Sequence, residues 1–396
     1  MAGDKSTRRE FLGTGLAAAL MLTGSGRAQT KGKSRTMLLY VGTYTSKTKS
    51  EGIYVFRFDA ATGSLQRLHI AKDVADPSYL TVSNDRKHLF AVNELVEYDG
   101  QKSGAVSAFA IDPETGDLTF LNKQPSLGGA PCFITTSNDR KFALVANYVG
   151  GNISVFPIEK DGRLGASVDL AQHSGSGPKK DRQAAAHAHS INLDPANRYA
   201  FAADLGIDRL MIYAFDSQTG QLKPNDNQAY FQCKPGAGPR HFTFHPNGRL
   251  AFLINELDLS ITSLSYDAER GTLKEIQTVP TLPANASTAG ASCADIQVSP
   301  DGKFLYGSNR GHNSIVAYRV DQTTGKLGYL GHATAGIKKP RNFAIAPDGR
   351  FLLVANQESD SIVVFRRDLK TGKLTSTGIS TPVPAPVCLK FIQATV

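Results

Sequence analysis

The stretch Asp321-Gln322-Thr323-Thr324-Gly325-Lys326-Leu327 is the clearest copy of a motif that the chain repeats seven times. A Thr-Gly pair between two runs of alternating apolar residues predicts a β-hairpin turn, because glycine accepts the positive φ that such a turn requires. The copies recur about every fifty residues, a period typical of folds that repeat one structural unit. The other six copies centre on Gly63, Gly116, Gly162, Gly220, Gly271 and Gly372.

Each repeat contains the same series of apolar runs separated by turns, and each apolar run predicts a strand. In the last repeat, apolar runs at 342–346, 351–356 and 361–365 are separated by a Pro-Asp-Gly-Arg turn at 347–350 and a polar loop. The Thr-Gly turn and a short outer strand complete the unit. Because one such sheet cannot bury both of its faces, the repeats must pack on one another around an axis. We therefore predict an all-β fold, a single seven-bladed β-propeller of four-stranded antiparallel blades over residues 37–396.

The first repeat has no inner strand of its own. The chain's last apolar run, at 386–392, reads as an inner strand with no blade after it. We predict that it pairs with strands within residues 37–68 and closes the ring, which removes exposed sheet edges. The blades are expected to begin near Met37, Pro77, Pro131, Ala188, Pro239, Cys293 and Pro340.

The N-terminal residues have the pattern of an export signal. An Arg-Arg pair at 8–9 is followed by an apolar stretch at 11–22 and by small residues before Gln29. We predict a twin-arginine signal peptide at 1–28, a polar linker at 29–36, and a periplasmic or secreted protein. The apolar stretch is too short to span a bilayer comfortably, so no stable membrane span is expected after signal removal. The alternative is an accidental Arg-Arg pair before a disordered start.

The charge balance favours a small anionic partner over nucleic acid. The formal net charge of the chain is +9, and residues 1–28 contribute four basic against two acidic side chains, so their removal leaves 9 − 2 = +7. The excess is spread over the repeats, with no basic arm and no basic face with interleaved aromatic residues. A modest positive field suits an anionic small molecule. We expect a monomer and no nucleic-acid binding.

The cysteines are expected to be buried core thiols. None forms a Cys-x-x-Cys pair or has histidine at the spacing of a metal site. We predict no metal and no other cofactor. The four cysteines are Cys132, Cys233, Cys293 and Cys388.

The repeat also serves to align the blades. The first and second strands of a blade are antiparallel, so the start of the first and the end of the second lie at the same end of the blade. The residue just before the position at the end of the second strand is Asn or Asp in each repeat aligned. We interpret this residue as structural, because its side chain can bond the backbone of the turn it begins. The residues at the start of the first strand are Ser78, Cys132, His189, Arg240, Ala294 and Arg341. The residues at the end of the second strand are Glu94, Tyr148, Leu205, Glu256, Arg310 and Gln357.

This alignment gathers ionisable residues at one end of the central channel. Arginine binds carboxylate or phosphate with two hydrogen bonds, and histidine or glutamate can accept a proton from water. The alternative is that Arg and Glu of neighbouring blades only form ion pairs around the channel. The predicted catalytic residues are His189, Glu256, Arg240 and Arg310, and the predicted substrate-binding residues are His187, His241, Asn309, Arg341 and Glu94.

Other kinds of site are weaker candidates. We expect His187 and His189 to point to opposite faces, which leaves few convergent metal ligands. A nucleophilic serine is disfavoured because the chain has no Gly-x-Ser-x-Gly elbow. Residues 172–186 lengthen one loop between blades, either as a flexible linker or as a lid over the site.

Long motifs in this chain resemble those of the β-propeller lactonase family, which includes propeller-type 6-phosphogluconolactonase and carboxymuconate cyclase. The resemblance covers about residues 37–392. It implies a seven-bladed propeller without a required metal and a site of one His, one Glu and two Arg, which map onto His189, Glu256, Arg240 and Arg310. The matching motifs lie at 40–45, 187–190, 203–209, 238–241, 255–256, 308–315 and 340–343.

The residues and the resemblance lead to one hypothesis with two alternatives. The leading one is hydrolysis of a sugar-acid lactone, 6-phosphogluconolactone or a related gluconolactone, with His189 or Glu256 as general base and arginines on the anion. The export signal puts a phosphorylated substrate in question, because family members that use it work in the cytoplasm. The alternatives are a carboxymuconate-type cycloisomerase and a non-catalytic exported propeller that binds a carbohydrate or protein.

Overall fold

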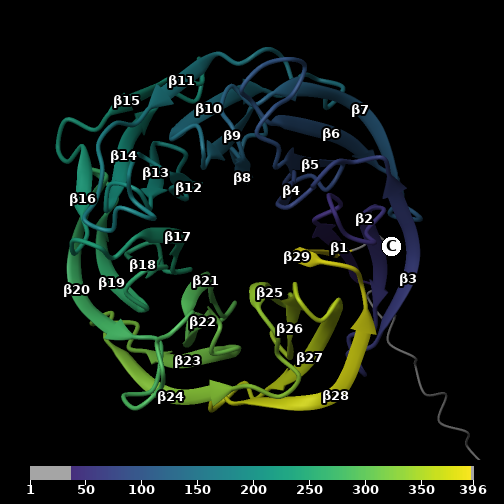
Figure 1. Cartoon of the computed structure of the whole chain (residues 1–396), viewed down its shortest axis with the longest axis vertical. Coiled ribbons are helices and arrows are strands. Elements are labelled where there is room, and N and C mark those ends of the chain that lie inside the picture. The colour runs from purple at the N-terminus through teal and green to yellow at the C-terminus, as the bar shows by residue number, and fades with distance from the viewer. Residues whose placement is uncertain (1–36, 394–396) are drawn as a thin grey trace, which may run out of the picture. The chain divides into compact units, whose positions relative to one another are not determined.

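The computed structural model describes residues 37–393, and these form seven antiparallel sheets arranged as blades around one axis (Figure 1). The predicted seven-bladed, all-β propeller is confirmed. Within these residues, no helix is long and apolar enough to cross a membrane. The predicted signal peptide at 1–28 and the linker at 29–36 lie outside the described residues.

The two inner strands of each blade position the site. The innermost strands surround the axis of the ring (Figure 1), and each pairs with the strand that follows it or, in the first blade, with β1. The innermost strands are β29 (Pro386–Gln393), β4 (Leu80–Val82), β8 (Pro131–Thr136), β12 (Ala188–Leu193), β17 (Pro239–Phe244), β21 (Ser292–Val298) and β25 (Pro340–Ile345). The second strands are β1 (Met37–Thr43), β5 (His88–Asn93), β9 (Phe142–Asn147), β13 (Tyr199–Asp204), β18 (Leu250–Asn255), β22 (Phe304–Arg310) and β26 (Phe351–Asn356).

The third and fourth strands form the outer part of each blade. The third strands are β2 (Gly52–Phe58), β6 (Ala105–Ile111), β10 (Asn152–Pro157), β14 (Arg209–Phe215), β19 (Ser260–Asp267), β23 (Ser314–Val320) and β27 (Ser361–Arg367). The outermost are β3 (Leu65–Lys72), β7 (Leu118–Pro125), β11 (Asp169–Gln172), β15 (Leu222–Pro224), β20 (Thr272–Pro280), β24 (Leu327–Ala333) and β28 (Leu374–Pro382).

One blade differs from the predicted four strands. Its outer strand is divided between β15 and a further strand, β16 (Tyr230–Gln232), and both pair with β14. β15 ends at Pro224, which has no backbone N–H to continue the ladder. The chain loops out and returns at Tyr230 to pair with the remaining residues of β14.

The C-terminal strand closes the ring as predicted. β29 pairs with β1 along its whole length, from Met37 opposite Gln393 to Thr43 opposite Pro386. The first blade therefore takes its innermost strand from the other end of the chain (Figure 1). The predicted blade starts hold except at Pro77, because regular pairing in that blade begins only at Leu80.

The seven glycine turns, five of which have Thr before the glycine, join the third strand to the outermost one. All seven glycines have positive φ, between 66° and 88°. A Cβ atom on Gly372 would lie 2.3 Å from the ring of Phe304, which belongs to the preceding blade. The other turn glycines touch the preceding blade in the same way, for example Gly63 against Phe351 and Gly271 against Tyr199. The turn therefore needs glycine both for its backbone and for contact between blades.

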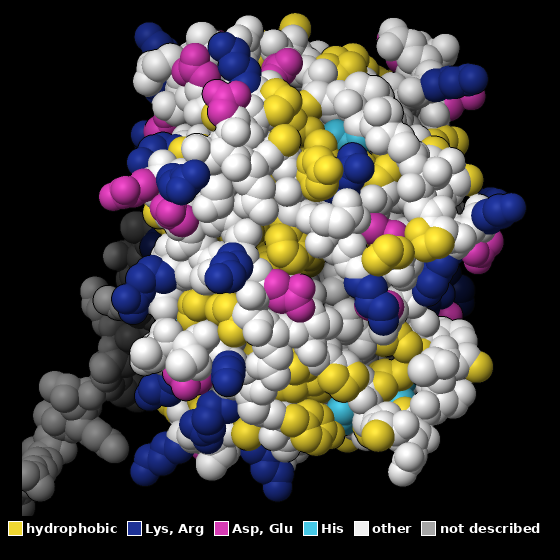
Figure 2. Space-filling model, turned by 90° about the vertical axis from the view of Figure 1, so that its left-hand side faces the viewer, with side chains coloured by type: hydrophobic (Ala, Val, Ile, Leu, Met, Phe, Trp, Pro, Cys, Tyr) yellow, Lys and Arg dark blue, Asp and Glu magenta, His cyan; other side chains and the backbone are white. Residues whose placement is uncertain are grey.

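The core lies between the blades. The second strands β9, β18 and β26 are buried at every residue, because each of their faces packs on a neighbouring blade. The four cysteines are free thiols, and all are buried, as predicted. On the side of the molecule in Figure 2, Lys and Arg lie among Asp and Glu and do not gather in one patch.

The strand pairing confirms the alignment of the blades. Pro239 at the start of β17 lies opposite Asn255 at the end of β18, and Pro340 lies opposite Asn356 in the same way. A register shift follows the first residue in both pairs, so that Arg240 and Arg341 are the extra residues of a bulge. A bulge re-aims a side chain, and here it turns these two away from the regular pleat.

Candidate functional site

Four predicted residues come together where the innermost strands begin. His189 lies in β12 and Arg240 in β17, while Glu256 follows β18 and Arg310 ends β22. These elements belong to three consecutive blades. The centre of the cluster is Glu256, whose side chain is only 4% exposed.

Three guanidinium groups bind the Glu256 carboxylate. Arg240 Nε lies 2.9 Å and Arg310 Nη2 2.8 Å from Oε2, and Arg182 Nη2 lies 2.6 Å from Oε1. Burial by itself would raise the pKa of Glu256, but Arg310, Arg240 and Arg182 outweigh it and lower the pKa to about 2. Glu256 is therefore ionised at neutral pH, with both oxygens engaged. The alternative prediction, that Arg and Glu of neighbouring blades form ion pairs, is therefore correct for Arg310 and Glu256.

Arg182 belongs to the long segment between β11 and β12 and was not predicted from the sequence. The segment is tied down near the site: Gln183 Nε2 donates to the Leu205 carbonyl and to Asp208, both at 2.8 Å. Lys179 Nζ donates to the Leu257 carbonyl at 2.7 Å. With its side chain 38% exposed, Arg182 is the most accessible of the three arginines on Glu256. Three basic residues among the four at 179–182 were the sequence signal that could have indicated it.

His189 is buried beside this cluster. Its ring lies 5.4 Å from that of Tyr148 and 5.4 Å from that of His241, centroid to centroid. Its Nδ1 lies 3.6 Å from Cys132 Sγ. Burial, followed by the charge of Arg240, holds the pKa of His189 well below its usual value. The imidazole is therefore neutral at pH 7.

His187 lies on the same side as His189, contrary to the expectation that they point to opposite faces. The His187 ring stacks on Tyr148 at 4.5 Å, and its Nδ1 lies 2.9 Å from the Tyr148 carbonyl oxygen. The expectation is wrong because residues two apart along a strand lie on the same face, and only adjacent residues point to opposite faces. His187 immediately precedes β12, which has a register shift between Ala188 and Ser190.

His241 links the site to a buried carboxylate. Its Nδ1 donates to Asp295 Oδ1 at 2.9 Å, and its Nε2 accepts from Arg240 Nη1 at 3.0 Å. Burial, followed by the charge of Arg240, lowers the pKa of His241 to about 4 despite the hydrogen bond to Asp295. Arg240 also donates to the Ala294 carbonyl at 2.6 Å, so its guanidinium is held from three directions.

Asp295 was not predicted as part of the site. It follows the aligned position Ala294, within a register shift between Cys293 and Ile296 that brings its carboxylate to His241. An aspartate near the start of a predicted innermost strand was the available sequence signal.

Glu94 and Arg341 form a second, looser pair. Arg341 Nη2 lies 3.8 Å from Glu94 Oε1, and its guanidinium lies 5.4 Å from the centroid of the Tyr44 ring. The Tyr44 hydroxyl and Ser78 Oγ donate to the Glu94 carboxylate. Glu94, Arg341 and Arg240 line one small cavity together with Cys132. The two predicted residues are thus placed next to the Glu256 cluster.

Asn309 is not available to a substrate. It is fully buried, and its Nδ2 donates to the Thr281 carbonyl at 3.0 Å and to Ser314 Oγ at 3.2 Å. Asn255 and Asn356 bond the same kind of partners in their own blades. The prediction of Asn309 as a substrate-binding residue is therefore wrong, and the structural interpretation of this Asn position is confirmed.

The site carries excess positive charge. Arg182, Arg240, Arg310 and Arg341 face three carboxylates, those of Glu94, Glu256 and Asp295, so the balance is 4 − 3 = +1 with neutral histidines. Arg310 Nε is buried and has no hydrogen-bond partner within residues 37–393. A buried N–H without a partner is costly unless a ligand or water satisfies it. The arrangement can therefore bind an anion and stabilise negative charge.

Comparison with known proteins identifies the class. The sequence model described as "Lactonase, 7-bladed beta-propeller" matches residues 38–391. The chain belongs to this family of β-propeller lactonases.

Named relatives agree with this assignment. The chain is 37% identical to a 6-phosphogluconolactonase of Bacillus subtilis over 354 residues, covering 89% of this chain and 98% of the relative. It is 38% identical to a 6-phosphogluconolactonase of Formosa agariphila, covering 78% and 86%. The solved structure of a periplasmic gluconolactonase from Pseudomonas aeruginosa superposes with a TM-score of 0.84 at 35% identity, covering 91% of this chain and 100% of that one.

Proposed function

We propose that the protein hydrolyses a gluconolactone-type sugar lactone. The observation that carries this proposal is a neutral, buried imidazole, His189, beside a cluster of arginines with excess positive charge. Hydrolysis of a lactone needs a base for water and a positive group for the oxyanion, and the cluster supplies both. The relatives named 6-phosphogluconolactonase and gluconolactonase support the same reaction class.

His189 rather than Glu256 is the proposed base. Both oxygens of Glu256 accept from guanidinium groups and its pKa is about 2, so it is a weak base. In the His189 tautomer with its proton on Nδ1, near Cys132 Sγ, Nε2 keeps its lone pair. No hydrogen bond within residues 37–393 engages that Nε2, so it is available to a water molecule.

The reaction then needs only groups of this chain. Water attacks the lactone carbonyl carbon while its proton moves to His189 Nε2, and negative charge develops on the carbonyl oxygen. Arg310, with its free Nε–H, and Arg240 stabilise this oxyanion. The ring C–O bond then breaks, and the imidazolium returns the proton to the leaving oxygen, which yields the hydroxy acid. Glu256 holds the arginines in place throughout.

The direct test is hydrolysis of glucono-δ-lactone and of its 6-phosphate by the purified protein. His189→Ala and Arg310→Ala are each expected to lower kcat by about 100- to 1,000-fold, the size found for loss of one base or oxyanion donor. Arg319→Ala, at an exposed position of β23, is the matched control and should leave kcat unchanged. Full activity in His189→Ala or Arg310→Ala would overturn the site assignment.

The pH dependence tests the environment described for His189. Because the pKa of His189 is held well below its usual value, it stays deprotonated in mild acid, and kcat/KM should keep its neutral value below pH 6.5. A pH-stat assay from pH 4 upward measures this. A fall of kcat/KM centred near 6.5 would show an unperturbed histidine and contradict the environment described for His189.

We further propose that the protein is exported and acts on a non-phosphorylated lactone. The Arg-Arg motif at residues 8–9 and the likeness to a periplasmic gluconolactonase support this. Fractionation of cells that express the full chain, with an Arg-Arg to Lys-Lys variant as control, tests it. Cytoplasmic retention of both forms, with a higher kcat/KM on the 6-phosphate, would favour the phosphorylated substrate.

A further inference from the structure

A layer of aromatic rings divides the central channel below the site. The Tyr79 and Phe133 rings stack at 4.3 Å, and the His241 ring meets Phe133 edge-on at 5.3 Å and Tyr79 at 5.9 Å. The three rings come from the beginnings of three innermost-strand segments. They separate the Glu256 cluster from the space further along those strands.

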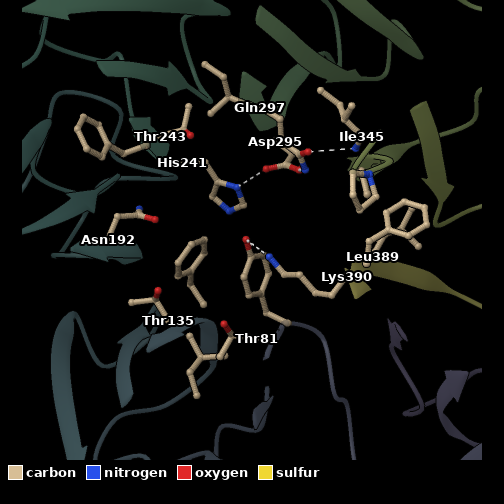
Figure 3. A pocket seen from close by; sticks show the side chains of 18 residues that line it. Thr81, Thr135, Asn192, His241, Thr243, Asp295, Gln297, Ile345, Leu389 and Lys390 are labelled. Carbon is tan, nitrogen blue, oxygen red and sulfur yellow. Dashed lines mark hydrogen bonds and ion pairs between the residues drawn. The ribbon is translucent and has the colours of Figure 1, made fainter. Parts of the chain in front are cut away.

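Beyond this layer lies a polar cavity of about 390 Å³ (Figure 3). Each innermost strand contributes one residue to the wall of this cavity. That residue lies three positions after the one aligned between blades at the start of the strand, as Thr243 lies three positions after Arg240. Six of these seven residues are polar, although a closed propeller core could fill them with apolar side chains. The seven are Thr81, Thr135, Asn192, Thr243, Gln297, Ala344 and Lys390.

Several groups of this ring have free hydrogen-bonding capacity. Asn192 Nδ2 is buried and has no partner within residues 37–393. The hydroxyls of Thr81, Thr135 and Thr243 also have no hydrogen bond with another described residue, and all three side chains line the cavity. Figure 3 shows Asn192, Thr135 and Thr81 on one side and Lys390 reaching in from the other.

Lys390 is the one cationic group among the lining residues, since His241 is neutral. Its Nζ lies 4.6 Å from the centroid of the Tyr79 ring and 3.4 Å from the hydroxyl. No carboxylate among residues 37–393 lies within 4.0 Å of it.

Asp295, the carboxylate in the same wall, is already saturated with donors. It accepts from His241 at 2.9 Å, Asn342 at 2.7 Å and Gln297 at 3.1 Å. Lys390 is close enough to contribute to the lowered pKa of Asp295, but no ion pair joins the two, so the Lys390 ammonium keeps donors for a ligand.

We propose that this cavity is a second binding site, for a small carboxylate that carries hydroxyl groups. The Lys390 ammonium would bind the carboxylate, and Asn192 with the three threonines would bind the hydroxyls. The volume lies in the range of small-molecule sites, about 300–1,000 Å³, and exceeds what an inorganic anion needs. The proposal rests on the ring and its free groups and does not depend on lactone hydrolysis.

Equilibrium dialysis with labelled gluconate as the probe tests the second site. The Arg310→Ala background removes one of the four arginines of the upper site and weakens binding there, so that the further loss caused by a Lys390 variant reports on the lower cavity. One gluconate per chain is expected to remain bound. Adding Lys390→Met should weaken that binding by about ten- to hundredfold, the loss expected for one charge-assisted hydrogen bond. Lys326→Met, at an exposed turn, is the matched control and should change nothing.

A second variant and a competitor sharpen the result. Asn192→Asp is close in size to the native residue and places a negative charge in the ring, so it should also weaken gluconate binding. Excess inorganic phosphate should not displace gluconate, because it lacks the extended array of hydroxyls. Unchanged gluconate binding in Lys390→Met and Asn192→Asp, or equal displacement by phosphate, would overturn the proposal. Lysine 390 variants should keep lactone hydrolysis, so failure of the hydrolysis assay is a separate outcome.

Discussion

At the scale of single residues, the Asp295–His241 pair decides how Arg240 is presented. Asp295 accepts the Nδ1 proton of His241, which leaves Nε2 as an acceptor for Arg240 Nη1. With the opposite tautomer, an N–H of His241 would face an N–H of Arg240, and the guanidinium would be displaced. Asp295 and His241 are thus positioning residues for the arginine that holds Glu256.

Replacing Asp295 by Asn should therefore lower kcat/KM by about ten- to hundredfold. An amide cannot accept from His241, Asn342 and Gln297 together, because one of its two terminal atoms is itself a donor. Steady-state kinetics and a thermal melt measure activity and stability separately. Asp194→Asn is the control, since Asp194 is an equally buried carboxylate that accepts from Tyr266 far from the cluster. Equal losses of activity in both variants would indicate general destabilisation instead.

At the scale of elements, the Thr-Gly turn is a contact between blades as well as a hairpin. Gly372 has φ of 76°, and its carbonyl accepts from the Tyr306 hydroxyl of the preceding blade at 2.8 Å. The Gly116 carbonyl accepts from Tyr40 in the same way. Each turn therefore locks onto the second strand of the blade before it, so the repeated motif sets the spacing of the ring.

Gly372→Ala should lower the free energy of unfolding by about 1–3 kcal/mol. The alanine would be held in the left-handed region, and its Cβ would overlap the Phe304 ring. Gly328→Ala is the matched control, because a Cβ at that strand position meets no atom within 4 Å. Chemical denaturation of both variants measures the difference. Equal midpoints would show that neither the φ nor the contact with Phe304 matters.

At the scale of the whole molecule, stability depends on joining the two ends of the described chain. β29 supplies the innermost strand of the first blade and buries Val387, Leu389 and Ile392 in the core. Each such side chain contributes about 1.5–3 kcal/mol when fully buried. The same strand also carries Lys390 into the channel, so ring closure completes the proposed second site.

Removing residues 386–396 should prevent formation of a stable monomer. The truncation leaves β1 as an unpaired sheet edge with a hydrophobic face, which favours aggregation or pairing between chains. Size-exclusion chromatography and circular dichroism measure the outcome, and removal of residues 394–396 alone is the control. A truncated chain that stays monomeric with an unchanged melting temperature would contradict the role assigned to β29.

Local sequence patterns were sufficient to predict the architecture of the fold and part of the candidate site. Seven turns with glycine at the required φ, and strands of fixed order between them, predict the propeller, and the shared register predicts that His189, Arg240, Glu256 and Arg310 share one end of the channel. These features depend on backbone geometry that repeats from blade to blade, so the sequence records them directly.

Only the tertiary structure decided which side chains complete the cluster. Arg182 comes from an irregular segment and reaches Glu256 across 74 residues of chain, and Asp295 reaches His241 through a register shift. The pleat of a regular strand cannot predict either contact, because loop paths and bulges are set by packing. The same packing assigns Asn309 to the blade interior and turns the Thr-Gly motif, first a sign of fold alone, into the contact that joins each blade to the one before it.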